Sequence, residues 1–294
     1  MNEFNWQWHT ADGEPRGIIV ICHGMAEHHQ RYHDFARFLK THGWHVLTYD
    51  HPGHGAQAKT LGYFGPSGWN AMTDRLTVML AHATQEAPDL PVWILGHSMG
   101  SFLVLDYATT MPLPEQCRGI VLIGTDSPAL GPTLALSLIG RMVRKRFGPK
   151  HVSPLLHRLT FGAFNRSVSE PRTEFDWICN NPEVVDKYIE DPLCGFGCSV
   201  DLWCELSQVL LRLWHNKTLA RLPPQCETLI LSGGRDPVGR FGKGPRELTS
   251  RLRRFGPGAE LKLYPTLRHE ILNESDKQVV WTDVQRMVSD FTPR

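Results

Sequence analysis

Ser98 has the clearest setting for covalent chemistry in this sequence, because it stands at the centre of the pentapeptide GHSMG, residues 96–100. The apolar run Pro91–Leu95 before it predicts a strand, and the pattern after Gly100 predicts a helix. A G-x-S-x-G motif at a strand–turn–helix junction holds its serine on a sharp turn, where glycines avoid collisions with the neighbouring elements. The free N–H groups at the helix start face a developing oxyanion. We therefore expect Ser98 to be a nucleophile.

A serine hydroxyl needs a general base to become a nucleophile. The loops after two downstream strands offer a histidine as this base and an aspartate to orient it. Asp236 follows the apolar run Thr228–Ser232, and His269 follows the run Glu260–Tyr264. The carboxyl ends of parallel strands meet at one edge of a sheet, so these side chains are expected near Ser98. The chain order serine, acid, histidine is the one found in hydrolases whose serine lies on a G-x-S-x-G nucleophile elbow. The sequence therefore predicts a triad of Ser98, Asp236 and His269.

A second carboxylate could orient the same histidine. Asp126 lies just beyond the apolar run Gly119–Ile123 and would reach the same edge of the sheet. Its structural alternative is an Asx turn or a cap at the start of the next segment. The chain order favours Asp236, and Asp126 stays the alternative acid.

An oxyanion site is expected between the elbow and the loop after an earlier strand. The run Gly17–Cys22 leads into residues 23–28, sequence HGMAEH, where Gly24 permits close approach of the backbone. Met25 then offers one N–H group, and Met99, directly after the nucleophile, offers the other.

The spacing of histidine and cysteine predicts neither a metal nor a cofactor. His23, His28 and His29 lack the spacing of a metal-binding helix. The seven cysteines are scattered and include no CxxC pair, which is typical of buried thiols in a reducing compartment.

Composition and charge exclude several function classes. The formal net charge is +1, so no strong field favours nucleic acid as a partner. The stretch MNEFNWQWHT lacks the basic and apolar regions of a signal peptide. No run approaches the roughly 20 apolar residues that a membrane span needs. We expect a cytoplasmic protein with a small-molecule substrate.

The order of predicted elements indicates a doubly wound α/β sheet. Short apolar runs bounded by Gly, Asp and Pro predict parallel strands at Gly17–Cys22, Trp44–Tyr49, Val92–Leu95, Gly119–Ile123, Thr228–Ser232 and Glu260–Tyr264. Alternation at Phe4–His9 predicts an antiparallel edge strand. Helical patterns occupy Tyr32–His42, Trp69–Glu86, Met99–Thr110, Pro245–Phe255 and Lys277–Phe291.

The alternation of strand and helix stops for about a hundred residues. The stretch 127–222 has no strand-like run and is rich in Leu, Trp, Arg, Pro and Cys. We interpret it as a helical cap or lid that divides the core into residues 1–126 and 223–294.

Together these motifs resemble the monoacylglycerol-lipase and lysophospholipase branch of the α/β-hydrolases, the serine aminopeptidase S33 type. The matching segments follow the family's order along almost the whole chain: HGMAEH at 23–28 with Arg31 and Tyr32, DHPGHG at 50–55, GHSMG at 96–100, and the loops of Asp236 and His269. The resemblance implies an α/β-hydrolase fold with a helical cap inserted after the sixth strand.

The resemblance also implies roles for individual residues. Ser98 is the expected nucleophile, Asp236 the acid and His269 the base, with the N–H groups of Met25 and Met99 at the oxyanion. The DHPGHG segment is expected to be structural, and DPLCGF at 191–196 resembles a cap segment of bacterial members. Despite the S33 label, Met99 departs from the G-x-S-W-G elbow of prolyl peptidases.

The expected activity is hydrolysis of acyl glycerol or lysophospholipid esters through an acyl-enzyme. The alternatives are a non-catalytic member that binds a small ligand, and a hydrolase of other small esters or amides. Aromatic side chains of the cap could wall an acyl pocket, although packing among helices explains them equally well. They are Trp177, Tyr188, Phe196, Trp203 and Trp214.

One cap segment allows two interpretations. Leu134, Leu138 and Met142 recur at helical spacing, and residues 141–146 are rich in arginine and lysine. A basic amphipathic lid suits transient contact with an anionic membrane surface. The same residues could equally pack onto the core domain, with a solvated basic end.

Overall fold

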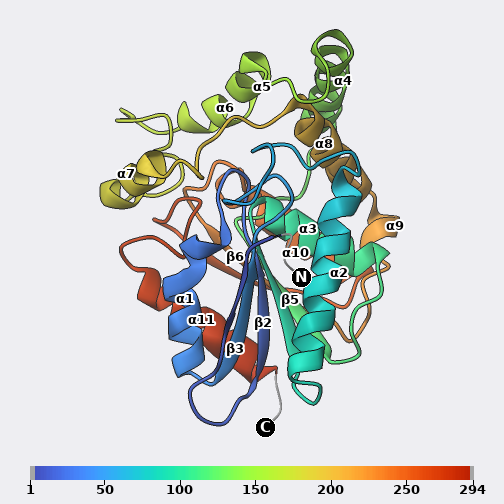
Figure 1. The fold of residues 1–294 in the computed structure, drawn as a ribbon, viewed down its shortest axis with the longest axis vertical. Helices are drawn as coiled ribbons and strands as arrows, with labels where there is room; N and C mark the ends of the chain where they lie inside the picture. Colours follow the sequence, from blue (N-terminus) through green and yellow to red (C-terminus); the bar gives the residue numbers. More distant parts are fainter. Residues whose placement is uncertain (1–3, 292–294) are drawn as a thin grey trace.

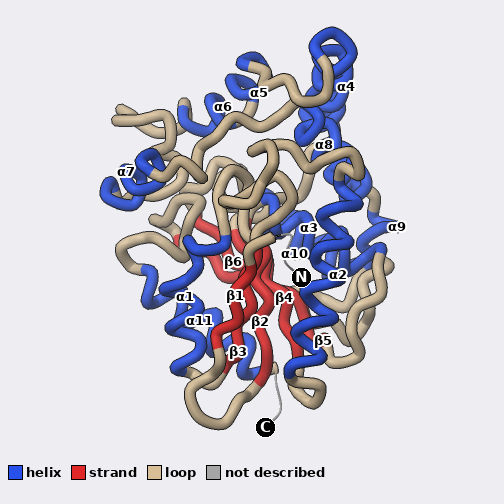
Figure 2. Tube along the Cα trace, in the orientation of Figure 1, coloured by secondary structure: helices blue, strands red, loops and turns tan. Residues whose placement is uncertain are grey.

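A seven-stranded sheet runs through the centre of the protein, in a computed structural model that describes residues 4–291 (Figures 1 and 2). The strand order is β1-β3-β2-β4-β5-β6-β7, in which β1 pairs antiparallel with β3 and the other neighbours pair parallel. The strands are β1 (Trp6–His9), β2 (Gly17–Cys22), β3 (Trp44–Tyr49), β4 (Val92–His97), β5 (Cys117–Ile123), β6 (Glu227–Gly233) and β7 (Glu260–Tyr264).

The apolar runs of the sequence form the expected strands, and the doubly wound architecture is confirmed. Alternate residues of each strand face opposite sides of the sheet and enter separate cores. Ile18 and Val20 of β2 belong to one core, whereas Ile19 and Ile21 belong to the other. Because both faces are covered, the central strands β2 and β4 are buried along their whole length, as parallel strands between two layers of helices require.

Helices cover both faces of this sheet (Figure 1). Residues of α1 and α11 fill one core, and residues of α2, α3 and α10 fill the other. A 3-10 turn, η1 (His29–Tyr32), precedes α1. The covering helices are α1 (His33–Thr41), α2 (Trp69–Glu86), α3 (Met99–Thr110), α10 (Lys243–Phe255) and α11 (Lys277–Asp290).

Along the chain, six further helices follow β5 and precede β6, in the region that the sequence analysis interprets as a cap. They are α4 (Leu130–Phe147), α5 (Pro154–Leu159), α6 (Phe161–Asn165), α7 (Pro182–Glu190), α8 (Val200–Trp214) and α9 (Asn216–Leu219). Figure 1 shows α4 to α8 beyond the carboxyl ends of the strands. An isolated bridge joins Val152 to Ser199 within this segment.

The expectation that this insertion follows the sixth strand is wrong. Five strands precede it, because a single strand, β1, lies before β2 along the described chain and residues 10–16 form a loop. Within residues 4–291, each helix is too short or too polar to cross the apolar core of a bilayer.

The strand register brings several loops to one edge of the sheet. His97 at the end of β4 lies opposite Ile123 at the end of β5, and Ile123 lies opposite Leu231 of β6. Gly233 and Tyr264 end β6 and β7 side by side. The residues that follow these four strands therefore meet at the edge beneath the inserted helices.

Candidate active site

Ser98 occupies a strained elbow between β4 and α3. Its backbone has φ 53° and ψ −119°, a conformation that residues other than glycine rarely adopt. Its N–H donates to the carbonyl of Ile123 at 2.9 Å, which fixes the turn to the end of β5. A Cβ at Gly96 would collide with the backbone of Gly100, and one at Gly100 with the backbone of Cys22. The glycines therefore permit the turn that presents Ser98.

His269 and Asp236 form a buried pair on the loops after β7 and β6. Nδ1 of His269 lies 3.0 Å from Oδ2 of Asp236, whose other oxygen accepts from the N–H of Val238 at 2.8 Å. Burial lowers the pKa of His269, but the Asp236 carboxylate reverses the shift, and the net pKa lies above its usual value of 6.5. Asp236 can thus fix the tautomer of the imidazole and stabilise its protonated form.

The histidine ring lies over the end of β5, next to the elbow. A Cβ at Gly124 would lie 2.9 Å from Cε1 of His269, and Gly124 itself has φ +60°. The rings of His269 and His97 have centroids 4.9 Å apart, and His97 directly precedes Ser98. The structure therefore brings Ser98, His269 and Asp236 to the same edge of the sheet.

Asp126, the alternative acid, has a different partner. Its Oδ1 accepts from Nε of Arg240 at 3.0 Å, and Arg240 also donates to the carbonyl of Ser127. Burial raises the pKa of Asp126 to about 7, although Arg240 opposes the shift. The geometry pairs His269 with Asp236 and leaves Asp126 in a contact between the loop after β5 and the loop after β6.

The loop after β2 lies against the elbow. A Cβ at Gly24 would lie 3.3 Å from Cβ of Ser98. The N–H of Gly24 donates to Oε1 of Glu27 at 2.5 Å, and the N–H of Ala26 donates to Nε2 of His54 at 3.2 Å. Within the described chain, the N–H of Met25, between these two, has no hydrogen-bond acceptor from the protein. It is thus available to a ligand.

Met99 supplies the second predicted N–H group. It is the first residue of α3, so its N–H has no intrahelical acceptor. The helix N-terminus also carries a partial positive charge that favours an oxyanion. Met99 thus follows Ser98 in the chain, and Met25 follows Gly24, which lies against Ser98 in space.

The DHPGHG segment supports this loop through neutral histidines. The N–H of His51 donates to Nε2 of His23 at 3.0 Å, and Nδ1 of His23 donates to the carbonyl of Gly24 at 2.7 Å. Burial lowers the pKa of His23 and His51 well below 6.5 and that of His54 to about 4. Neutral rings can accept the backbone N–H groups that hold residues 24–26 in place.

A buried ion-pair network joins the two loops, and sequence reasoning missed it. Nη1 of Arg31 donates to Glu27 and to Glu270 at 2.6 Å each, and Nη2 donates to Glu270 at 2.7 Å. Burial raises the pKa of Glu27, but Arg31 reverses that shift and holds it well below its usual range. Because Glu270 follows His269, Arg31 links the histidine loop to the loop of Met25.

Aromatic side chains of the inserted segment reach the histidine. The ring of Trp177 lies 5.1 Å from that of His269, and Phe161 stacks on Trp177 at 5.7 Å. Phe161 and Trp203 line a cavity of about 470 Å³ on the far side of this stack. A chain of apolar contacts therefore leads from the cavity to His269.

The other predicted aromatic residues have separate positions. The hydroxyl of Tyr188 donates to the carbonyl of Ala26 at 2.8 Å, and the ring of Phe196 lies 5.4 Å from that of His54. Tyr188 therefore contacts the loop after β2, and Phe196 contacts His54, which accepts a backbone N–H of that loop. Trp214 lines two other surface hollows together with Arg251.

Known proteins resemble this chain over much of its length. Residues 13–276 match the family model described as serine aminopeptidase, S33. The monoacylglycerol lipase of Mycolicibacterium smegmatis is 28% identical over 280 residues, covering 94% of this chain and 89% of that protein. The phospholipase YtpA of Bacillus subtilis is 33% identical over 126 residues, which cover 43% of this chain and 45% of that enzyme.

A solved structure is similar over nearly the whole chain. A highly thermostable carboxyl esterase from Bacillus coagulans, in complex with glycerol, superposes with a TM-score of 0.92 at 25% identity. The alignment covers 99% of this chain and 94% of the esterase.

Proposed function

The chain belongs to the serine aminopeptidase S33 family of hydrolases, and on that premise we propose that it cleaves carboxylic esters of acyl glycerol or lysophospholipid type. One observation carries the proposal: the elbow of Ser98 and the buried pair of His269 and Asp236 meet at the same edge of the sheet. The printed names of two relatives, a monoacylglycerol lipase and a phospholipase, support the same class of substrate.

In the proposed reaction, Oγ of Ser98 bonds to the ester carbonyl carbon and His269 takes its proton. The carbonyl oxygen becomes an oxyanion, which accepts hydrogen bonds from the N–H groups of Met25 and Met99. His269 then gives its proton to the leaving alcohol, and an acyl-enzyme forms. Water, deprotonated by His269, attacks this ester and releases the acid and Ser98. Asp236 stays ionised and stabilises the imidazolium.

We propose that residues 127–222 act as a cap that binds the acyl chain. Trp177 and Phe161 lie between His269 and the cavity that Trp203 lines, and all three side chains are apolar over most of their surface. Burial of an acyl chain there would contribute about 0.8 kcal/mol per methylene group. The cavity therefore favours a long-chain ester over a short one.

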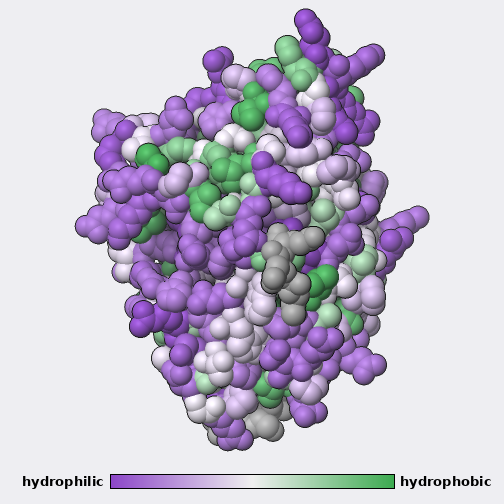
Figure 3. Space-filling model, viewed as in Figure 1, coloured by the Kyte–Doolittle hydropathy of each residue, from purple (hydrophilic) through white to green (hydrophobic). Residues whose placement is uncertain are grey.

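The exposed face of α4 is the proposed site of transient membrane-surface contact. Leu138 and Met142 are 60% and 64% exposed, and Figure 3 shows apolar side chains over the inserted helices. Arg144 is already paired with Asp201 at 2.9 Å, which leaves the exposed Arg141, Lys145 and Arg146 to meet anionic lipid. Leu138→Asp with Met142→Asp should abolish co-sedimentation with anionic liposomes. Val78→Asp on α2, 45% exposed, is the matched control.

A panel of esters tests the substrate class. We expect the purified protein to hydrolyse long-chain monoacylglycerol or lysophosphatidylcholine faster than acetyl esters, and to leave peptide anilides intact. Preference for acetyl esters or for amides would favour the alternative of a hydrolase of other small substrates. Complete inactivity on the whole panel would favour a non-catalytic ligand-binding member of the family.

A further inference from the structure

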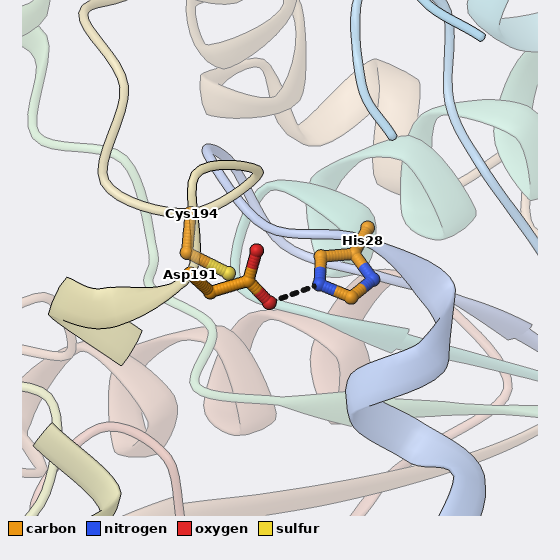
Figure 4. Close-up of side chains that lie close together, drawn as sticks. All are labelled: His28, Asp191 and Cys194. Atoms are coloured by element: carbon orange, nitrogen blue, oxygen red, sulfur yellow. Dashed lines mark hydrogen bonds and ion pairs between the residues drawn. The ribbon is translucent and has the colours of Figure 1, made fainter. Parts of the chain in front are cut away.

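Three side chains with metal-binding atoms converge where the inserted segment meets the loop after β2. Nε2 of His28 lies 2.8 Å from Oδ2 of Asp191, and Sγ of Cys194 lies within 4.8 Å of both atoms. Figure 4 shows the imidazole, the carboxylate and the thiol turned toward one another. Imidazole, carboxylate and thiolate are all ligands of Zn²⁺.

Asp191 and Cys194 are held in place by a tight turn after α7. The N–H of Cys194 donates to the carbonyl of Asp191 at 2.9 Å, and the N–H of Leu193 donates to Oδ1 of Asp191 at 2.8 Å. Oδ2 is thereby left for His28. Two of the three ligand atoms thus sit on a preformed turn, which reduces the entropy lost when a cation binds.

Access and charge also favour a cation. His28 and Cys194 are buried, but the side chain of Asp191 is 32% exposed, so an ion can enter from solvent. Next to His28 in the chain, Glu27 shares one guanidinium, that of Arg31, with Glu270, and the Asp191 carboxylate faces His28. These three carboxylates outnumber the single guanidinium, and a divalent cation would reduce the excess of negative charge.

We propose that His28, Asp191 and Cys194 bind a thiophilic divalent cation of the Zn²⁺ class through Nε2, Oδ2 and Sγ, with water as a fourth ligand. Such an ion takes ligands at about 2.0–2.3 Å in a tetrahedron. It would replace the hydrogen bond between His28 and Asp191 and draw in the sulfur. Cys194 releases its thiol proton to solvent as the sulfur–metal bond forms.

The location gives the ion a consequence for the neighbouring loop. The N–H of Gly195 and the hydroxyl of Tyr188 both donate to the carbonyl of Ala26, at 2.9 and 2.8 Å. A bound cation would exchange the existing hydrogen bond between His28 and Asp191 for metal–ligand bonds and so strengthen the link between this segment and the loop of Met25. If the proposed function holds, the ion should slow turnover by restraining the cap, and the binding itself does not depend on that function.

Equilibrium binding of Zn²⁺ and Co²⁺ to the chelator-treated full chain tests the site. We expect one ion per chain and, with Co²⁺, a sulfur-to-metal charge-transfer band in the near ultraviolet. Cys194→Ser and His28→Gln should abolish the band or weaken affinity by more than the roughly 100-fold that loss of a supporting residue costs. Asp191→Asn can still accept the N–H of Leu193 in the turn but removes the charge, and it should also weaken binding.

Cys198→Ser is the matched control, since Cys198 is buried in the same segment but lies outside the cluster. The parent and this control should bind alike, and Ser98→Ala should bind as the parent does, which separates the metal site from catalysis. Thermal unfolding of each metal-free variant establishes that it is folded. Absence of stoichiometric binding by the parent, or binding unchanged in Cys194→Ser, would overturn the proposal.

Discussion

Nδ1 of His269 lies 3.0 Å from Oδ2 of Asp236, and the two side chains come from the loops after neighbouring strands β7 and β6. Both are almost fully buried, so water does not screen the interaction. The carboxylate therefore has a stronger influence on the imidazole than a surface pair would have. This relationship determines the tautomer, and hence which nitrogen can face Ser98.

Asp236→Asn should lower kcat by about 10⁴, because an amide can stabilise the wrong tautomer of His269. Asp126→Asn is the matched control, since its carboxylate pairs with Arg240, and it should keep most of the activity. Steady-state kinetics with one long-chain ester compare the two. An inactive Asp126→Asn variant and an active Asp236→Asn variant would show that Asp126, and not Asp236, is the acid of the triad.

The pH dependence of kcat/KM should report the raised pKa of His269. Protonation removes the base, so activity falls as pH falls through this pKa, and the midpoint is expected above 6.5. In Asp236→Asn the raising carboxylate is gone while burial still lowers the pKa, so the midpoint should move to lower pH. Profiles of residual activity with an ester that does not titrate give both values. A parent midpoint below 6.5 contradicts the expected shift.

Gly24→Ala should displace the loop that offers the N–H of Met25. The new Cβ would lie 2.6 Å from Oε1 of Glu27 and 3.3 Å from Cβ of Ser98, so either the Glu27 side chain that accepts from the Gly24 N–H or the loop itself must move. Loss of one oxyanion donor costs about 10²–10³ in kcat. Gly131→Ala on α4, where a Cβ meets nothing within 4 Å, should leave kcat unchanged. Equal kcat for the two variants would show that the N–H of Met25 does not bind the oxyanion.

Arg31→Met should destabilise the fold, because Glu27 and Glu270 would stay buried without their shared cation. Breaking a buried ion pair in this way costs about 3–5 kcal/mol. Arg172→Met is the control, since Arg172 and its partner Asp186 are both about half exposed, and little change is expected. Urea unfolding at neutral pH measures both. Equal midpoints would show that the network contributes nothing to stability.

The residues at strand ends could be predicted because their positions follow from local patterns and do not depend on distant packing. Once β4, β6 and β7 are recognised as parallel strands, Ser98, Asp236 and His269 must share one edge. Local signals are enough here: apolar runs, the glycines of the elbow and the chain order.

The contacts across the insertion could not be predicted in the same way. Arg31 and Glu270 are 239 residues apart, and His28 and Asp191 are 163 apart. The contact of His28 with Asp191 depends on how residues 127–222 fold back onto the core, and that of Arg31 with Glu270 joins the loops after two separate core strands. No periodicity of the sequence encodes either contact. The count of six strands before the insertion came from the family resemblance, whereas the strand-like runs of the sequence number five there, as do the strands of the structure.

Labelling with a fluorophosphonate tests the central claim, that Ser98 is the nucleophile, most directly. The parent should react with one equivalent of the probe, and peptide mapping should place the adduct on Ser98. Ser98→Ala should lose the label and at least about 10⁴ in ester hydrolysis while unfolding at the same temperature as the parent. Labelling that persists in Ser98→Ala at another serine, together with retained hydrolysis, would contradict the assignment.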